Sequence, residues 1–475
     1  MDTKALRQKI LDLAIHGKLV PQDPNDEPAS VLLERIKAEK ERLIKEGKIK
    51  RSKKSAKSSD TPHYENVPFE LPNSWVWCRL EDIAYVASGS TPDKTCFVEN
   101  GVPYIKMYNL RNQKIDFAYH PQYITEEVHN GKLQRSRTEV GDLIMNIVGP
   151  PLGKLAIIPT TLPQANFNQA AVLIRPYKFK EVLVSYLKVY LEEMSEINSI
   201  ATRGSAGQVN ISLTQSQNMR IPIPPLNEVR RIIEEVSKYD ILIDSLKQNI
   251  TDIQNLIAYT KSKILDLAIH GKLVPQDPND EPAIELLKRI NPDFTPCDNG
   301  HYPVGWIETI LGELFSHNTG KALNSSNKEG IFKDYLTTSN VYWNKFDFTA
   351  IKQMPFKESE LNKCTVTEGD LLVCEGGDIG RSAIWNYDYD ICIQNHIHRL
   401  RPKIDLCVPF YYYTFAYLKE NNLIGGKGIG LLGLSSNALH KIEMPLPPLA
   451  EQQRIVQKIE ELFSVLDNIQ NALEV

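Results

Sequence analysis

The stretch KILDLAIHGKLVPQDPNDEPA at residues 9–29 recurs letter for letter at residues 263–283. These 21 consecutive identities exclude chance and reveal an internal repeat with an offset of 254 residues. Other segments repeat at offsets of 231, 228 and 223 residues: Pro72 and Trp75 match Pro303 and Trp306, Gly141-Asp142-Leu143 matches Gly369-Asp370-Leu371, and Pro222-Ile223-Pro224-Pro225-Leu226 matches Pro445-Leu446-Pro447-Pro448-Leu449.

The two kinds of offset are compatible with one circularly permuted repeat. The offsets 254 and 223 add up to 477, which is two more than the 475 residues of the chain. We therefore expect the N- and C-termini to lie close together and to rebuild jointly the element that residues 226–269 form continuously. An approximate two-fold axis should relate the two halves.

The repeated element at residues 226–269 has the apolar spacing of a coiled-coil helix. Apolar residues from Val229 to Leu267 alternate spacings of three and four, which is a sustained heptad pattern. About 44 residues at a rise of 1.5 Å each predict a helix on the order of 65 Å long. The same rhythm runs from Ile455 to Leu473 and resumes from Leu6 to Leu13. We expect the two helices to pack antiparallel and to act as a spacer.

Two segments with short β-rich runs lie between these helices, and each also contains a predicted helix, at residues 182–195 and 409–420. The predicted fold class is α+β, with two α+β domains separated by two long antiparallel coiled-coil helices. The predicted boundaries are 1–60 for the N-terminal helix, repeat segment and basic arm, 61–225 for the first domain, 226–296 for the central helix and repeat segment, 297–448 for the second domain, and 449–475 for the C-terminal helix.

The composition is that of an ordinary soluble globular protein. The formal net charge is −4, and 42% of the residues are hydrophobic. No apolar run approaches the length of a membrane span, and no signal-peptide core follows the start, so we expect a cytoplasmic protein without a membrane partner. Seven cysteines without a CxxC pair indicate reduced thiols.

Catalytic motifs are missing from the sequence. The run from Gly149 to Leu155 departs from a phosphate loop, and no HExxH, GxSxG or amino-methyltransferase signature occurs. His396 and His398 lack a third ligand at metal-site spacing, so we predict no metal site. No catalytic residue and no cofactor is therefore predicted for this chain.

Signals for nucleic-acid binding are local rather than global. Lys and Arg balance Asp and Glu at 15 against 15 in residues 61–222 and 14 against 16 in residues 300–445. Residues 37–57, in contrast, carry 10 basic and 3 acidic side chains. This basic arm could neutralise phosphates, although a solvated helix end leading into a linker explains it equally well.

Two kinds of position are candidate DNA contacts in both domains. A Gly-rich basic loop precedes each closing strand and offers Arg203, Gly204 and Gln208 in the first domain and Lys427 and Gly428 in the second. Strand ends carry polar groups that could read base edges, although such residues are also common turn formers. These strand-end candidates are Lys106, Asn109, Arg111, Thr337 and Asn340.

A family resemblance rests on these features together. The run PLPPLAEQQRIV at residues 445–456, a Pro-rich strand exit that leads into a heptad helix, occurs in related form twice. With the permuted repeat and the IHGKLVPQDPNDEPA stretches, the chain resembles the specificity subunit of type I restriction–modification systems along essentially its whole length. In the first copy Asn227-Glu228-Val229 departs from the Ala-Glu-Gln form at the helix start.

The resemblance implies a division of labour with partner subunits. Each domain would read one half of a bipartite asymmetric site in double-stranded DNA, and the helices would act as a ruler. It also implies two modification subunits and two restriction subunits, with S-adenosylmethionine, ATP and Mg only in those partners. Since identical segments should meet identical partners, we expect the repeat segments to dock two copies of one partner. The candidate partner contacts are Ile15, Leu19, Val20, Ile269, Leu273 and Val274.

Two other classes of function stay open at this point. A coiled-coil scaffold with protein-binding globular ends would show the same helices, and sequence-specific retention of DNA by the assembled complex would discriminate against it. A hidden nuclease or methyltransferase is disfavoured by the missing motifs, and turnover by the isolated chain would revive it.

Overall fold

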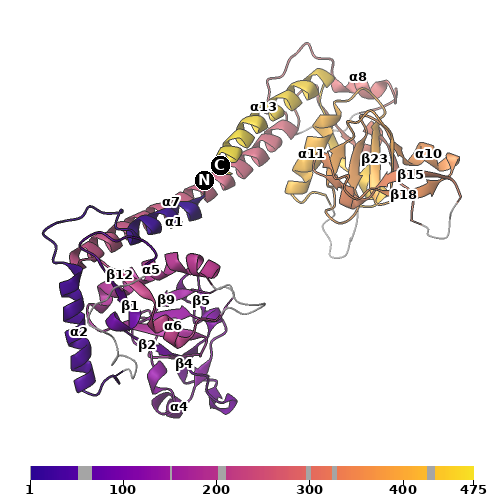
Figure 1. The fold of residues 1–475 in the computed structure, drawn as a ribbon. Helices are drawn as coiled ribbons and strands as arrows, with labels where there is room; N and C mark the ends of the chain where they lie inside the picture. Colours follow the sequence, from indigo (N-terminus) through magenta and orange to yellow (C-terminus); the bar gives the residue numbers. More distant parts are fainter. Residues whose placement is uncertain are drawn as a thin grey trace. The chain divides into compact units, whose positions relative to one another are not determined.

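The computed structural model describes residues 2–51, 67–149, 152–201, 210–295, 301–323, 329–424 and 434–474 (Figure 1). The chain divides into two compact units. The N-terminal unit comprises Asp2–Gln248 and the C-terminal unit includes Asn249–Val475, so the division falls within one helix, α7 (Leu226–Ile269). Each unit is an α+β domain with a helix pair attached, which confirms the predicted fold class.

The N-terminal unit begins with α1, continues through two four-stranded sheets and ends in the first part of α7. The sheets have the strand orders β2-β11-β8-β9 and β10-β4-β7-β3, and two-stranded pairs join β1 to β12 and β5 to β6. The elements are α1 (Thr3–Ile15), α2 (Ala29–Lys45), β1 (Val76–Arg79), α3 (Leu80–Ile83), β2 (Ala84–Ser88), η2 (Lys94–Cys96), β3 (Phe97–Val98), β4 (Val102–Ile105), η3 (Met107–Asn109), β5 (Leu110–Arg111), β6 (Lys114–Ile115), β7 (Tyr123–Ile124), α4 (Glu126–Asn130), η4 (Gln134–Ser136), β8 (Leu143–Asn146), β9 (Leu155–Ile157), β10 (Asn166–Phe167), β11 (Ala171–Pro176), α5 (Lys180–Ala201), α6 (Leu213–Gln217) and β12 (Arg220–Ile223).

The C-terminal unit repeats this plan after the second part of α7, except for one edge strand of its second sheet. Its sheets have the orders β14-β23-β20-β21 and β18-β15-β22-β19, with the pairs β13-β24 and β16-β17. The elements are α8 (Ala283–Lys288), β13 (Ile307–Ile310), α9 (Leu311–Leu314), β14 (Phe315–Thr319), β15 (Ile331–Leu336), η5 (Thr338–Asn340), β16 (Val341–Tyr342), β17 (Lys345–Phe346), β18 (Lys352–Phe356), α10 (Glu358–Cys364), β19 (Thr365–Val366), β20 (Leu371–Cys374), β21 (Ser382–Ile384), β22 (Ile391–Ile393), β23 (Ile397–Pro402), α11 (Val408–Glu420), α12 (Ser436–His440), β24 (Glu443–Leu446) and α13 (Leu449–Glu474).

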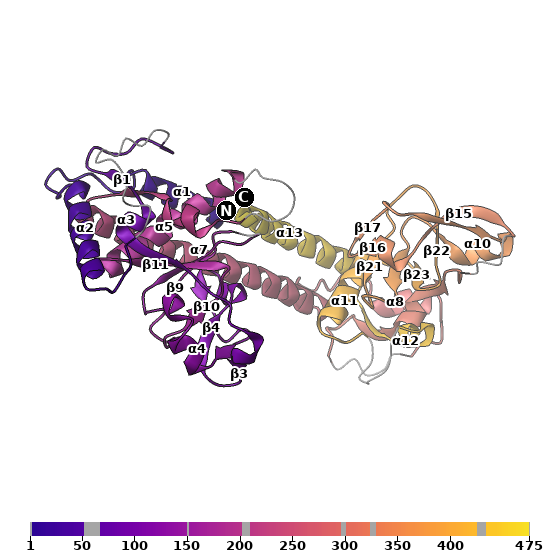
Figure 2. The same cartoon turned by 60° about the horizontal axis from the view of Figure 1, so that its bottom comes forward.

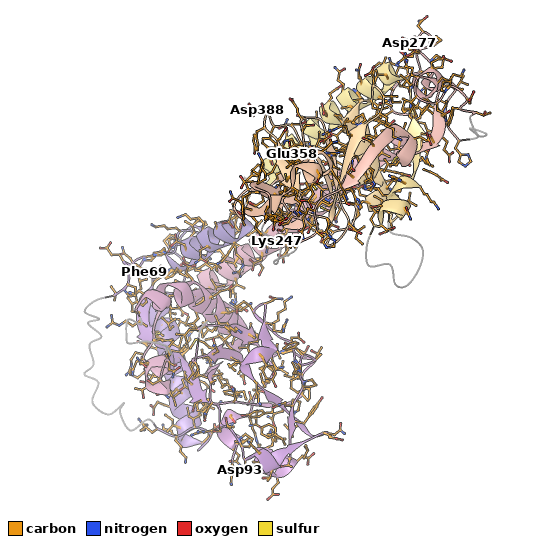
Figure 3. All side chains as sticks on the ribbon, turned by 90° about the vertical axis from the view of Figure 1, so that its right-hand side faces the viewer. Phe69, Asp93, Lys247, Asp277, Glu358 and Asp388 are labelled. Atoms are coloured by element: carbon orange, nitrogen blue, oxygen red, sulfur yellow. The ribbon has the colours of Figure 1, made fainter. Side chains whose placement is uncertain are left out.

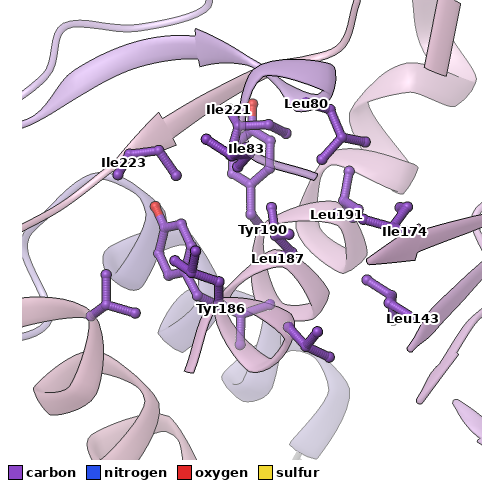
Figure 4. Close-up of a cluster of buried hydrophobic side chains, with 14 of the residues drawn as sticks. Leu80, Ile83, Leu143, Ile174, Tyr186, Leu187, Tyr190, Leu191, Ile221 and Ile223 are labelled. Carbon is purple, nitrogen blue, oxygen red and sulfur yellow. The ribbon is translucent and has the colours of Figure 1, made fainter. Parts of the chain in front are cut away.

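Alternating side chains place the central sheet of the N-terminal unit between two apolar layers. Because successive residues of a strand face opposite sides, Leu143 and Met145 of β8 join the cluster that contains α5, whereas Ile144 packs with the second sheet. Figure 4 shows Tyr186, Leu187, Tyr190 and Leu191 of α5 in the first cluster. That cluster also contains side chains of α1, α2 and α7, so the helix pair and the domain share one core.

The helix pairs are antiparallel within each unit. Along α7 in the N-terminal unit, Arg7 of α1 binds Asp240 at 2.8 Å, while Gln22, further along the chain, reaches back to Glu228 near the start of α7. In the C-terminal unit α13 runs beside the second part of α7 (Figure 1, Figure 2), where Lys261 pairs with Asp467. The predicted helix at 226–269 is confirmed to the residue.

The middle of α7 lacks the packed stripe that the heptad pattern predicts. No residue is buried between Ile243 and Ile257, a stretch that the structure describes completely. The heptad residues Tyr239 and Ile253 are exposed. The reason is that α1 covers the first part of the helix and α13 the second, which leaves the middle open to solvent; Lys247 in Figure 3 belongs to this stretch.

The identical repeat segments are anchored by the same contacts in both units. Gly17 and Gly271 both have φ of +66°, and a Cβ atom at either position would lie within 2.6 Å of a proline ring carbon, in Pro72 or Pro303. Only glycine fits such a close approach in the left-handed region. The repeat segment therefore packs against the start of each domain, just before the tryptophans that the sequence comparison aligned.

Side chains of the repeat segment also reach back to the first two turns of the long helices. Asp26 binds Arg231 at 2.6 Å, and Asp280 binds Arg454 at 2.6 Å. Gln276 donates to Glu451 at 2.6 Å, and Trp306 donates to the same carboxylate at 2.9 Å. Burial raises the pKa of Glu451, while these hydrogen bonds act in the opposite direction. The repeat segment thus fixes each domain to its helix.

A cluster of three histidines around the buried His398 makes the stability of the C-terminal unit depend on pH. His317 lies 2.7 Å from His398, and burial, followed by the charges of His398, His440 and Arg399, lowers the pKa of His317 to about 4. The unfolded chain takes up this proton near pH 6.5, so stability is complete above that pH and is lost as the pH falls toward 4.

We expect the C-terminal unit to lose on the order of 1 kcal/mol between pH 7 and pH 5 through His317, after solvent screening. Urea unfolding followed by hydrogen exchange in residues 301–474 measures this loss. The His317→Gln variant can place an amide N–H near the position of Nε2, toward His398, but has no proton to take up, so its free energy of unfolding should fall less steeply with pH. If the free energy of unfolding falls equally with pH in both proteins, His317 is not the cause of the loss.

Candidate nucleic-acid interface

Asn109 and Asn340 hold equivalent turns and face the interior. Their side chains are 1% and 3% exposed. Asn109 accepts from the backbone N–H of Lys106 at 2.9 Å and donates to the carbonyls of Asp116 and Tyr119 at 3.1 and 2.8 Å. Asn340 accepts from the N–H of Thr337 at 2.8 Å and donates to the carbonyl of Asp347 at 2.9 Å.

The prediction that these two asparagines read base edges is therefore corrected. Both amides are buried and bind backbone groups of their own loops, so exposing either one to a base would leave those groups unpaired. Asn109 and Asn340 shape the loops on which other side chains are displayed.

The remaining strand-end candidates are accessible to different degrees. Lys106 is half-buried, and its ammonium lies 5.5 Å from the ring centre of Phe97. Arg111 has 47% of its side chain exposed. The Thr337 hydroxyl lies 2.7 Å from that of Ser339 and donates to Asn340 at 2.8 Å, so it is partly engaged within its own turn. Arg111 is the most exposed of the three.

The Gly-rich loop candidates Arg203, Gly204, Gln208, Lys427 and Gly428 lie outside the described residues. The residues that follow these loops are anchored alike in both units. The N–H of Ile211 donates to the carbonyl of Ile147 at 2.9 Å, and the N–H of Leu434 donates to that of Glu375 at 3.0 Å. These pairs occupy equivalent positions in the repeat.

Two short hairpins, β5–β6 and β16–β17, display side chains that the sequence analysis did not single out. In the first, the turn residues Asn112 and Gln113 have φ of +49° and +56°, and the exposed Lys114 follows. In the second, Asn344 has φ of +50° and the exposed Lys345 follows. Aligning the two domains beyond Val341 would have found these lysines, because they match at the offset of 231.

In each domain an arginine also stacks on a tyrosine at the hairpin, with Arg111 on the hairpin in the first domain and Tyr342 on it in the second. The guanidinium carbon of Arg111 lies 4.0 Å from the ring centre of Tyr119, and that of Arg381 lies 5.0 Å from the ring centre of Tyr342. Stacking restricts these otherwise mobile side chains and keeps them near the surface.

The basic arm is partly neutralised where the structure describes it, up to residue 51. Within and beside α2, Arg42 pairs with Glu39 and Glu46, and Arg51 pairs with Glu41. Lys40 donates to the carbonyl of Glu81 at 2.7 Å, which ties the helix to the domain. A role of the basic arm in binding DNA or a partner stays a prediction.

The predicted partner contacts fall into two groups. Ile15 and Ile269 are buried in the cores of their units, so the prediction that they touch a partner directly is corrected. Leu19, Val20, Leu273 and Val274 are half-buried at the edge of the same cores. The loop beyond them is exposed in both copies, as Asp277 illustrates in Figure 3.

The helices present further apolar side chains to solvent in both units. Such clusters on a helix surface are typical of protein interfaces. Those of the N-terminal unit are Tyr239, Ile241 and Leu242, and those of the C-terminal unit are Ile253, Leu256, Tyr259, Val465 and Ile469.

Among the described residues, no group of three or more His, Cys, Asp and Glu side chains could hold a metal ion. His396 is exposed and lies 3.3 Å from Glu375, whereas His398 belongs to the histidine cluster of the C-terminal unit. In the same part of the chain, no helix is long and apolar enough to cross a membrane.

Comparison with known proteins identifies the family of this architecture. The chain is 28% identical to the type I restriction enzyme EcoEI specificity subunit of Escherichia coli, over 99% of this chain and 91% of that protein. It is 27% identical to the EcoAI specificity subunit of Escherichia coli, over 98% of this chain and 90% of that protein.

Solved structures share the fold at lower identity. A chain from work on complex assembly and conformational transition of the type I R-M system superposes with a TM-score of 0.56 at 19% identity, covering 86% of this chain and 94% of that chain. The HsdS subunit from Thermoanaerobacter tengcongensis superposes with a TM-score of 0.51 at 19% identity, covering 85% of this chain and 93% of that one.

The family model "Type I restriction modification DNA specificity domain" matches twice, at residues 72–255 and 303–475. The two matches cover both α+β domains and the helices that follow them. The chain therefore belongs to the family of type I restriction–modification DNA specificity subunits.

Proposed function

We propose that this chain is the DNA-recognition subunit of a type I restriction–modification complex. Each α+β domain reads one half of a bipartite asymmetric site, and the helices set the spacing between the halves. The observation that carries the proposal is a contrast within the repeat. The segments that join each domain to its helix are identical in sequence, whereas the exposed hairpins differ in sequence at their tips. Two domains that read different half-sites need this combination.

The accessible strand-end residues are the proposed DNA contacts of this function. Lys106 and Arg111 supply positive charge in the first domain, and Thr337 supplies a hydroxyl in the second. The proposed DNA contacts also include, on the basis of the sequence alone, the Gly-rich loop residues Arg203, Gly204, Gln208, Lys427 and Gly428. Half-sites about one helical turn apart, roughly 10 bp, would place both domains on one face of the duplex.

Methyl transfer and cleavage are assigned to partner subunits. Two modification subunits would bind S-adenosylmethionine and methylate adenine, and two restriction subunits would use ATP and Mg. The repeat segments would dock the modification subunits through Leu19, Val20, Leu273 and Val274, together with the exposed apolar side chains of the helices. This arrangement gives each unit one equivalent partner.

Single-molecule sequencing of adenine methylation tests the proposal. Cells that express this chain with its cognate methyltransferase should show a bipartite methylated motif that is missing from cells with the methyltransferase alone. Replacing residues 61–225 with those of another recognition domain should then change one half of the motif. If the partner is active and bound but no motif depends on the chain, the scaffold alternative is favoured instead.

A further inference from the structure

The two hairpins combine a constant frame with a variable tip. Residues 104–117 and 335–348 align at the offset of 231, and five positions are identical: Tyr104 with Tyr335, Asn109 with Asn340, Lys114 with Lys345, Asp116 with Asp347, and Phe117 with Phe348. The three positions at the tip differ completely, with Arg111-Asn112-Gln113 in the first domain and Tyr342-Trp343-Asn344 in the second.

The frame has a structural reason to be constant. In both domains the N–H of the aspartate donates to the backbone carbonyl of the buried asparagine at 2.8 Å, and the asparagine amide donates to the aspartate carbonyl. Each hairpin is also hydrogen-bonded to a neighbouring segment. In the first domain the backbone N–H of Leu155 donates to the side-chain oxygen of Gln113 at 2.7 Å. In the second domain the backbone N–H of Asn344 donates to the carbonyl of Ser382 at 3.1 Å. Two equally supported hairpins therefore project their tips from equivalent places.

The tips offer different chemistry at one equivalent position. Arg111 presents a guanidinium that stacks on Tyr119 and lies 3.7 Å from the exposed carboxylate of Asp116, whereas the matching Tyr342 presents a ring that is 39% exposed and is backed by Arg381. A guanidinium suits the two acceptors of guanine in the major groove, and an aromatic ring suits the methyl group of thymine. The hairpin therefore carries the cation in the first domain and the aromatic ring in the second.

The lysine that follows each tip is the same. A cation kept in two domains with different tips fits a group that both half-sites share, which is the phosphate backbone. Lys114 and Lys345 are both exposed at the first residue of the returning strand.

We propose that the hairpins β5–β6 and β16–β17 determine the specificity of the two domains. Arg111 and Tyr342 read bases, each in its own half-site, and Lys114 and Lys345 bind phosphates. Asn109 and Asn340 are positioning residues that hold the tips. This inference rests on the proposed function, because it names the residues through which the same DNA interface discriminates sequences.

The test compares adenine methylation motifs in cells that express the methyltransferase with the wild-type chain or with variants. Arg111→Ala and Arg111→Lys should each relax one or two positions of one half-site, raising methylation at non-cognate bases about tenfold, while the other half stays unchanged. Tyr342→Ala should relax the opposite half. The lysine variant of Arg111 keeps the charge, so its effect separates base reading from electrostatics.

Lys114→Ala and Lys345→Ala should leave the motif unchanged. They should weaken DNA binding by the complex severalfold for all sequences and reduce the salt dependence by about one phosphate contact each. Lys132→Ala is the matched control, because Lys132 is an exposed lysine of the first domain, 82% exposed, that does not belong to the hairpin β5–β6. It should change neither the motif nor the salt dependence.

The outcomes separate this inference from the proposed function. An unchanged motif for both tip variants, in complexes that still contain the methyltransferase, overturns the hairpin assignment and leaves the recognition function standing. A wild-type chain that confers no motif overturns the recognition function itself.

Discussion

Removing one heptad from the middle of α7, residues 244–250, is expected to shorten the gap between the two half-sites by about 3 bp. Seven residues of helix span about 10.5 Å, and one base pair rises about 3.4 Å. Because seven residues are close to two full turns, the faces of the helix that pack against α1 and α13 stay in register to within about 20°. The deleted stretch contains no buried residue, so both cores remain intact.

The measurement is the methylated motif of cells that carry the shortened chain and the methyltransferase. Inserting one heptad at the same place should lengthen the gap by a similar amount. Lys247→Ala is the length-matched control and should leave the gap unchanged. An unchanged gap in the shortened chain, with the methyltransferase still bound, would refute the role of α7 as a ruler.

The long helix and the helix of each domain were predictable from the sequence. The heptad from Val229 to Leu267 predicts α7 with its observed ends, Leu226 and Ile269, because a Pro-rich strand exit precedes it and Gly271 follows. The predicted helices at 182–195 and 409–420 correspond to α5 and α11. These elements follow from local periodicity, which a single sequence contains.

The individual roles of polar residues were less predictable. Asn109 has the side chain of a base reader, but its amide binds carbonyls seven and ten residues further along, and only the folded loop reveals those partners. The sequence held one signal: an asparagine at the same place in two domains whose hairpin tips differ belongs to the frame. The prediction that Ile15 contacts a partner failed for a related reason. Its segment is identical in both copies, and packing in the core accounts for that identity as well as a partner contact would.

The Gly-Asp-Leu motifs that recur at residues 141–143 and 369–371 have a structural role in both domains. Asp142 and Asp370 are 0% and 1% exposed in their side chains. Asp370 binds Arg401 through two hydrogen bonds of 2.8 and 2.6 Å and accepts from the N–H of Thr367 at 2.8 Å. Asp142 binds Arg175 in the same way, at 2.9 and 2.6 Å.

Replacing Asp370 with alanine is expected to destabilise the C-terminal unit by about 3 kcal/mol, because it leaves Arg401 and a backbone N–H without their buried acceptor. Asp370→Asn keeps an acceptor and should cost less. The matched control is Arg289→Ala, which breaks the 2.7 Å pair with Glu281, where the side chains are 50% and 51% exposed. An exposed pair contributes less than about 1 kcal/mol.

Urea unfolding of the full chain, resolved to the C-terminal unit by hydrogen exchange, measures all three variants. Asp142→Ala should produce the corresponding loss in the N-terminal unit and leave the C-terminal unit unaffected, since the two aspartates belong to separate units. If Asp370→Ala costs no more than Arg289→Ala, burial does not strengthen this ion pair. The recurrence of the motif would then reflect the turn at Gly369, whose φ is +87°, rather than the carboxylate.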